Sequence, residues 1–193
     1  VDDKSIIDRW EPNDSQPFFG DASLSAGPHT VVMEFYNLTG GAAAHLGWTR
    51  MDTTDTAAVV DDGSVGFSAG GASSGWNTAY SGYGGRSRWT YNRAGFWARW
   101  MPALPRLGRY EVLVNVPWTS NATRTARYYL KHEGDVAEFT IDQQARAGQW
   151  VSLGIYGFNA NDTEWVHLDA ITPEAAGTRT VGFDAVKWLY RGQ

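Results

Sequence analysis

The sequence has no cysteine, and this absence excludes disulfide bonds, thiolate metal sites and cysteine nucleophiles. Lysine is scarce as well, with three residues against thirteen arginines, and the basic residues are scattered without a polybasic run. Because the net charge is −5, we expect the chain to bind neither nucleic acid nor anionic membranes. It has no apolar run of membrane-spanning length, so we expect no membrane insertion.

Helix signals are almost absent, whereas strand signals recur along the chain. Short runs of β-branched and aromatic residues alternate with Gly, Pro and Asn turns at intervals of roughly ten residues, which is typical of an antiparallel sandwich. The sequence therefore predicts an all-β, jelly-roll-like sandwich. Its predicted strands include residues 95–104, 108–117, 126–134, 136–142, 150–158, 164–171 and 180–190. Period-two alternation places Tyr110, Val112, Val114 and Val116 inward.

The composition changes near residues 52–61, where the chain becomes small, polar and acidic. We place a boundary near residue 57, which gives an N-terminal β segment with a linker (1–57) and a main sandwich (58–193). Residues 29–51 predict one β-hairpin in the first segment. About fifty residues with one hairpin are too few to bury a good core alone, so this segment must dock on something else.

The most unusual stretch is 75–100, where eight of twenty-six residues are aromatic. Phe96 and Trp100 share one strand face and are expected in the core, together with Trp76. The remaining aromatic and arginine side chains could stack on sugar C–H faces or form a protein interface, or the loop aromatics could simply fold over the open end of the sandwich. The candidate contact residues are Tyr80, Tyr83, Trp89, Tyr91, Trp97 and Arg99.

No arrangement of residues predicts catalysis or a metal site. The histidines, His29, His45, His132 and His167, lie in separate segments without a recognised motif spacing. Asp61 and Asp62 are interpreted as opening a strand, and Asp184 as tying a loop by accepting backbone N–H bonds. We therefore expect no catalytic residues, no metal ligands and no cofactor.

From residue 58 onward, the order of motifs is informative. The chain contains "VVDDGSVGFS", "YSGYGG", "FWARWMPALPRLGRYEVLVNVP", "IDQQARAGQWVSLGIYGF" and "FDAVKWL" in this order. Together they resemble the golvesin C-terminal and xanthan lyase carbohydrate-binding-like domain over about residues 58–191. This resemblance implies an extracellular β-sandwich module, appended to secreted enzymes or surface proteins, whose ligand would be a polysaccharide or a cell-surface glycan.

The segment before it, "DRWEPNDSQPFFGDASLSAGPHTVVMEFYNLTGGAAAHLGW", resembles the closing part of the protective-antigen-type β domain. An incomplete fold leaves strand edges that a neighbouring copy could complete. This gives an alternative function, the subunit of an extracellular filament or surface layer that forms a homo-oligomer. The residues expected to carry the assembly contact are Ile6, Ile7, Trp10, Val31, Met33 and Phe35.

Three N-x-T sequons are possible glycosylation sites, at Asn37, Asn121 and Asn161. The chain begins with Val1, as a processed secreted protein or a fragment of a larger protein would. In Thr- and Asn-rich loops chance is the better explanation of any single sequon, and the extracellular or cell-surface location that we expect follows from the family resemblance.

Overall fold

The computed structural model describes residues 1–10, 18, 22, 24–25, 27–39, 44–47 and 57–192. The chain divides into two compact units, residues 1–52 and residues 53–193. Among the described residues, no helix is long and apolar enough to span a membrane.

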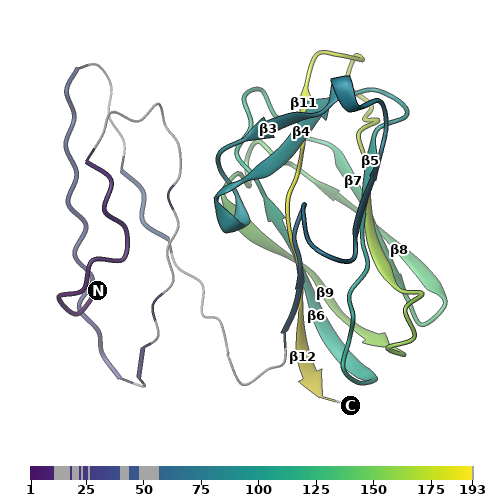
Figure 1. Cartoon of the computed structure of the whole chain (residues 1–193), viewed down its shortest axis with the longest axis horizontal. Coiled ribbons are helices and arrows are strands. Elements are labelled where there is room, and N and C mark those ends of the chain that lie inside the picture. The colour runs from purple at the N-terminus through teal and green to yellow at the C-terminus, as the bar shows by residue number, and fades with distance from the viewer. Residues whose placement is uncertain are drawn as a thin grey trace. The chain divides into compact units, whose positions relative to one another are not determined.

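Within residues 57–192 the chain forms three antiparallel sheets (Figure 1). The four-stranded sheet has the order β1-β12-β6-β9, with bounds Ala57–Val60, Val186–Gly192, Gly108–Val116 and Gln149–Phe158. The five-stranded sheet has the order β2-β5-β10-β7-β8, with bounds Phe67–Gly70, Trp97–Trp100, Trp165–Asp169, Ala126–His132 and Asp135–Ile141. The three-stranded sheet has the order β11-β4-β3, with bounds Thr180–Phe183, Ser87–Tyr91 and Asn77–Ala79. This confirms the predicted all-β antiparallel sandwich.

The core lies between the four-stranded and five-stranded sheets. Each sheet contributes the residues on one face of its strands, because successive side chains of a strand point to opposite faces. The predicted inward row of β6 is confirmed, since Tyr110, Val112, Val114 and Val116 are all buried. From the five-stranded sheet, Ala98 and Trp100 are buried as predicted, and Val166, Leu168 and Leu130 join them. Phe96, which directly precedes β5, is also buried as predicted. Trp76 packs against this core edge-on to Phe96 and Phe183.

The strand predicted over 180–190 is two strands, and this prediction was wrong. β11 pairs with β4 in the three-stranded sheet, whereas β12 pairs with β6 and β1 in the four-stranded sheet. The chain changes sheets at Asp184 and Ala185. The indole N–H of Trp100 donates to the carbonyl of Asp184 over 2.7 Å, and the amide of Asn115 donates to the carbonyl of Ala185 over 2.8 Å. These long-range hydrogen bonds fix the corner.

The acidic residues of this region have structural roles. Asp184 accepts a hydrogen bond from the backbone N–H of Tyr83 over 2.9 Å, which confirms the interpretation of Asp184 as a loop tie. Asp61 and Asp62 follow strand β1 instead of opening a strand, which corrects that interpretation. They lie in a turn in which Ser64 Oγ accepts from the amide of Asp61 over 2.6 Å.

In the N-terminal unit, the structure assigns no strand to any described residue from 1 to 47. Asp2 pairs with the segment around His29, because its Oδ1 accepts from the amide of Thr30 over 2.9 Å and its Oδ2 lies 2.6 Å from His29 Nδ1. The rings of Trp10 and Tyr36 stack with centroids 5.5 Å apart. An isolated hairpin of two strands is at best marginally stable in water. Residues 40–43 and 48–56 lie outside the described residues, so the hairpin over 29–51 stays a prediction.

Candidate functional site

The outer face of the five-stranded sheet carries most of the partly exposed aromatic side chains of that sheet. Directly paired residues point to the same face of an antiparallel sheet. One row across the sheet runs from Arg99 on β5 through His167 on β10 and Tyr129 on β7 to Glu138 on β8. The flanking rows carry Trp97 with Asp169, and Trp165 with Lys131. We call Trp97, Arg99, Tyr129, Trp165 and His167 the aromatic face.

His167 stands at the centre of the aromatic face. Its ring centroid lies 5.5 Å from that of Trp97, 5.9 Å from that of Trp165 and 6.2 Å from that of Tyr129. These spacings are within the usual range for packed aromatic pairs, so the rings support one another. The Nε2 atom of His167 lies 3.2 Å from Asp169 Oδ1, which fixes the direction of the ring.

Arg99 bridges the two tryptophans of the aromatic face. Its guanidinium carbon lies 4.5 Å from the ring centre of Trp165 and 5.9 Å from that of Trp97. A cation over an aromatic ring is attracted by the negative π-face, so Arg99 holds both indoles in place. All five residues of the aromatic face are half-buried, which leaves each of them partly accessible. The result is a preorganised surface with aromatic planes and polar groups side by side.

Gly70 on β2 makes room for Trp97. It is the cross-strand partner of Trp97 in the β2–β5 pairing. A Cβ atom built on Gly70 would overlap Nε1 and Cε2 of the Trp97 indole. The absence of a side chain at residue 70 therefore lets the indole lie over the neighbouring strand.

The sequence-predicted contact residues fall on different parts of the sandwich. Trp97 and Arg99 lie on the aromatic face, but Trp89 and Tyr91 lie on β4 of the three-stranded sheet, with ring centroids 5.6 Å apart. Tyr80 is 86% exposed in the loop after β3, and Tyr83 packs edge-on against Trp150 at 5.6 Å. Each of these residues is at least partly exposed, but they do not share one sheet. The contact role of Tyr80, Tyr83, Trp89 and Tyr91 stays a prediction.

The sequence interpretation missed Tyr129, Trp165 and His167. The signal was present, because both 126–134 and 164–171 were predicted as strands. Alternation from the apolar residues Val166 and Leu168 would have placed Trp165 and His167 on the opposite face. The sequence does not show that β5 and β10 are neighbours in the sheet, because their paired residues are nearly seventy positions apart.

The acidic groups near the corner do not form a metal site. Burial raises the pKa of Asp184 to about 9, and the carboxylates of Asp61 and Asp62 contribute in the same direction. Burial also raises the pKa of Asp61 and of Asp62 themselves. No group of three or more His, Asp and Glu residues in the described part of the chain could hold a metal ion.

The three sequons differ in their surroundings. Asn37 is exposed. Asn121 is engaged, because its Nδ2 donates to the carbonyl of Thr178 over 2.7 Å and its Oδ1 accepts from Arg179 over 2.6 Å. In the third sequon, Asn161 Oδ1 accepts from both the amide and the hydroxyl of Thr163. Glycosylation stays a prediction for all three.

Known proteins resemble this chain over the β-sandwich. The family model described as the golvesin C-terminal domain matches residues 58–190. The structure of a Paenibacillus xanthan lyase is similar with a TM-score of 0.61 and 26% sequence identity, and the match covers 71% of this chain and 13% of that chain. A Clostridium thermocellum endo-1,4-β-D-xylanase 10B, solved as CBM22-1 and GH10 modules with xylohexaose, has a TM-score of 0.29 and 17% identity, covering 62% of this chain and 26% of that chain. No curated protein matches.

The matched residues 58–190 take in nearly all of the three sheets. The motifs "DQQ" and "DAVKW" have defined places there. Gln143 is buried, donates to Tyr128 Oη over 3.0 Å and to the carbonyl of Gly182 over 2.9 Å, and accepts from the amide of Gly182 over 2.9 Å. Asp184 forms the corner, and Val186 and Trp188 enter the core. The chain belongs to the golvesin C-terminal domain family.

Proposed function

We propose that this chain is a non-catalytic module that binds polysaccharide on the aromatic face of its five-stranded sheet. The observation that carries the proposal is the cluster of Trp97, Tyr129 and Trp165 around His167 and Arg99. A pyranose ring has an apolar face made of C–H groups, and an aromatic plane is the side chain that covers such a face best. The module would act outside the cell, where polysaccharides are found.

Polar groups surround the rings of the aromatic face. Arg99, Lys131, Asp169 and Glu138 lie on the same outer face as the rings, from four neighbouring strands. Sugar hydroxyls both donate and accept hydrogen bonds, so a surface that offers cations and carboxylates can satisfy them. Because the groups lie on strands and not on loops, little backbone conformational entropy is lost when a ligand binds.

The comparisons support a glycan ligand without naming it. A xanthan lyase is similar over the sandwich, and by its name it acts on xanthan. The present chain spans only a small part of that protein, so the ligand of this chain is a proposal of its own. Xanthan is therefore the first polysaccharide to test.

The direct experiment is affinity electrophoresis of the whole chain in native gels cast with and without xanthan, followed by other soluble polysaccharides. We expect a polysaccharide in the gel to slow the protein, and Trp165→Ala to abolish the retardation. The matched control is Trp150→Ala, because Trp150 is also a half-buried strand tryptophan but lies on β9 of the four-stranded sheet. Equal retardation of both variants would exclude the aromatic face as the binding surface.

The N-terminal unit supports a second candidate function, assembly into an extracellular filament or layer. Of the predicted assembly residues, Ile7, Trp10, Val31, Met33 and Phe35 are exposed, and Ile6 is half-buried. Large exposed apolar patches usually mark interaction surfaces, and this many exposed apolar side chains in one unit favour an interface. Sedimentation velocity tests this candidate on the full chain. A Val31→Asp and Phe35→Asp double variant should remove any self-association of the wild type, and a wild type that is monomeric at every concentration would rule the candidate out.

A further inference from the structure

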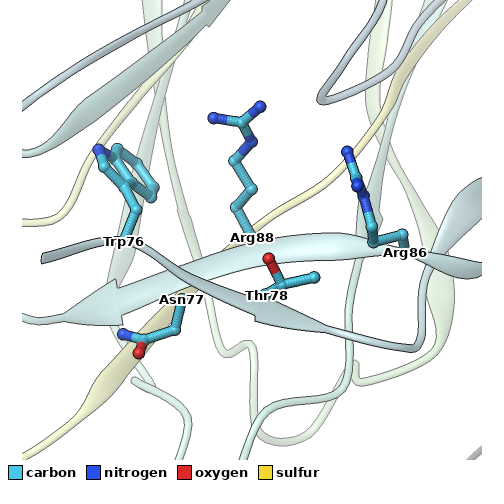
Figure 2. Close-up of a pocket in the computed structure, with 5 residues that line it drawn as sticks. All are labelled: Trp76, Asn77, Thr78, Arg86 and Arg88. Atoms are coloured by element: carbon cyan, nitrogen blue, oxygen red, sulfur yellow. The ribbon is translucent and has the colours of Figure 1, made fainter. Parts of the chain in front are cut away.

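A hollow lies on the three-stranded sheet and shares no residue with the aromatic face. It has a volume of about 270 Å³ and is lined by Trp76, Asn77, Thr78, Arg86 and Arg88. This volume is close to the lower end of the range for small-molecule sites, which suits one sugar unit more than a chain. Figure 2 shows Trp76, Arg86 and Arg88 projecting to the same side of strands β3 and β4.

Arg86 and Arg88 point to the same side because of the backbone conformation around β4. Arg86 has an extended backbone, with φ −149° and ψ 150°, and directly precedes β4. Residues two apart in an extended strand point to the same face, so Arg86 and Arg88 stand next to each other. Thr78 is the cross-strand partner of Arg88 and adds a hydroxyl group to the same face.

Asp62 and Phe67 hold the Arg88 side chain in position. Its Nε donates to Oδ2 of the buried Asp62 over 3.2 Å, and its guanidinium carbon lies 5.3 Å from the ring centre of Phe67. Neither terminal nitrogen of Arg88 donates to a residue in the described part of the chain. Asp62 therefore orients the guanidinium and leaves its outer edge, with two parallel N–H groups, available to a ligand.

Arg86 supplies a second positive charge. It is exposed, and it forms no hydrogen bond or ion pair with any described residue. It lies close enough to Asp61 and Asp62 to stabilise their ionised forms. Asp62 is already paired with Arg88, so a ligand in the hollow meets Arg86 and the free edge of Arg88 first. A planar carboxylate matches the fork of N–H groups that a guanidinium offers.

We propose that the hollow lined by Trp76, Thr78, Arg86 and Arg88 binds an anionic sugar unit, with its acidic group on the two arginines. The indole of Trp76 would face the C–H groups of the ring, and Thr78 would bond one of its hydroxyls. This inference deepens the proposed function, because it takes the ligand to be a glycan and names the class of sugar that the module selects. It rests on residues separate from the aromatic face.

The test is a titration of the ¹⁵N-labelled full chain, followed by amide chemical shifts, with D-glucuronate, D-glucose and D-glucose 6-sulfate as probes and inorganic sulfate as a fourth. D-glucuronate should shift the amides of Thr78, Arg86 and Arg88, and D-glucose should bind at least about tenfold more weakly, because charge-assisted hydrogen bonds are lost. D-glucose 6-sulfate distinguishes a carboxylate from a sulfate as the preferred acidic group.

Arg86→Gln should weaken D-glucuronate binding at least about tenfold. The matched control is Arg109→Gln, which removes the same charge from an exposed position on β6 and should leave the affinity unchanged. Equal affinity for D-glucose and D-glucuronate, or an unaffected Arg86→Gln variant, would overturn the proposal. Inorganic sulfate that binds as tightly as both anionic sugars would also overturn it, because the ring would then contribute nothing.

The two experiments can exclude the aromatic face or the hollow as a glycan site independently of each other. If the Trp165→Ala variant still binds polysaccharide, the aromatic face is excluded while the D-glucuronate shifts at Thr78, Arg86 and Arg88 still decide the hollow. If those shifts are absent while polysaccharide retards the wild type and not Trp165→Ala, the hollow is excluded and the aromatic face stands.

Discussion

The indole of Trp97 lies over the backbone of Gly70, its partner on the neighbouring strand. Gly70 has no unusual backbone conformation that would itself require glycine, so the space it leaves is its main contribution. We predict that Gly70→Ala displaces the Trp97 indole and weakens polysaccharide binding, with only a small loss of stability because the indole is on the outer face. Isothermal titration calorimetry and urea unfolding would measure the two effects. Unchanged affinity in a folded Gly70→Ala variant would show that the position of Trp97 does not matter for binding.

A second prediction concerns Gln143, the buried centre of the "DQQ" motif. Its side chain satisfies Tyr128 Oη and both backbone groups of Gly182. Gln143→Ala leaves these buried polar atoms unpaired and should lower the free energy of unfolding by roughly 3 kcal/mol. Gln144→Ala is the control, because Gln144 is an exposed neighbour whose replacement should cost less than about 0.5 kcal/mol. Urea unfolding followed by tryptophan fluorescence would give both values, and equal costs would contradict this role.

A third prediction follows from the pKa of Asp184, which burial raises from 3.8 to about 9. The folded chain keeps a proton on Asp184 that the unfolded chain releases above its ordinary pKa. The contribution of Asp184 to the free energy of unfolding should therefore be highest below pH 3.8. Between pH 3.8 and about 9 this contribution should fall by up to about 1.4 kcal/mol per pH unit.

Asp184→Asn removes the titrating group and keeps an oxygen that can accept from the amide of Tyr83. The variant should lose much of the decline in stability between pH 5 and pH 8. Part of the decline should remain, because burial also raises the pKa of Asp61 and Asp62. Unfolding free energies of the wild type and the variant at several pH values test this. Parallel curves would mean that Asp184 is ionised in the folded protein.

A fourth prediction is that the purified chain does not cleave polysaccharide. His167 and Asp169 form the one His–carboxylate pair on the aromatic face in the described residues, and they lie on an open sheet surface without a nucleophile beside them. Assays for new reducing ends and for unsaturated products from xanthan should both be negative. A turnover that disappears in Asp169→Asn would contradict the non-catalytic account.

Much of the sandwich could be predicted from the sequence, because alternation along a strand is a local property. The inward rows of β5 and β6 followed directly from residues such as Ala98 and Val112. The corner at Asp184 could not be predicted, since it depends on hydrogen bonds from Trp100 and Asn115, which are distant in sequence.

The candidate site was predictable only in part for the same reason. Trp89 and Trp97 are eight positions apart and look like one cluster in the sequence, yet they lie on different sheets. Trp97 and Trp165 are far apart in the sequence, yet they flank the same histidine. Sheet pairing brought the aromatic face together, and strand patterns do not encode which strands pair.

The measurement that tests the central claim most directly is the affinity of the full chain for xanthan, by isothermal titration calorimetry, in the wild type and in a Trp97→Ala, Trp165→Ala double variant. If the aromatic face binds polysaccharide, the double variant should lose at least about tenfold in affinity, or about 1.4 kcal/mol, while Trp150→Ala keeps the wild-type value. Circular dichroism should show that all variants remain folded. A folded double variant with wild-type affinity would contradict the account.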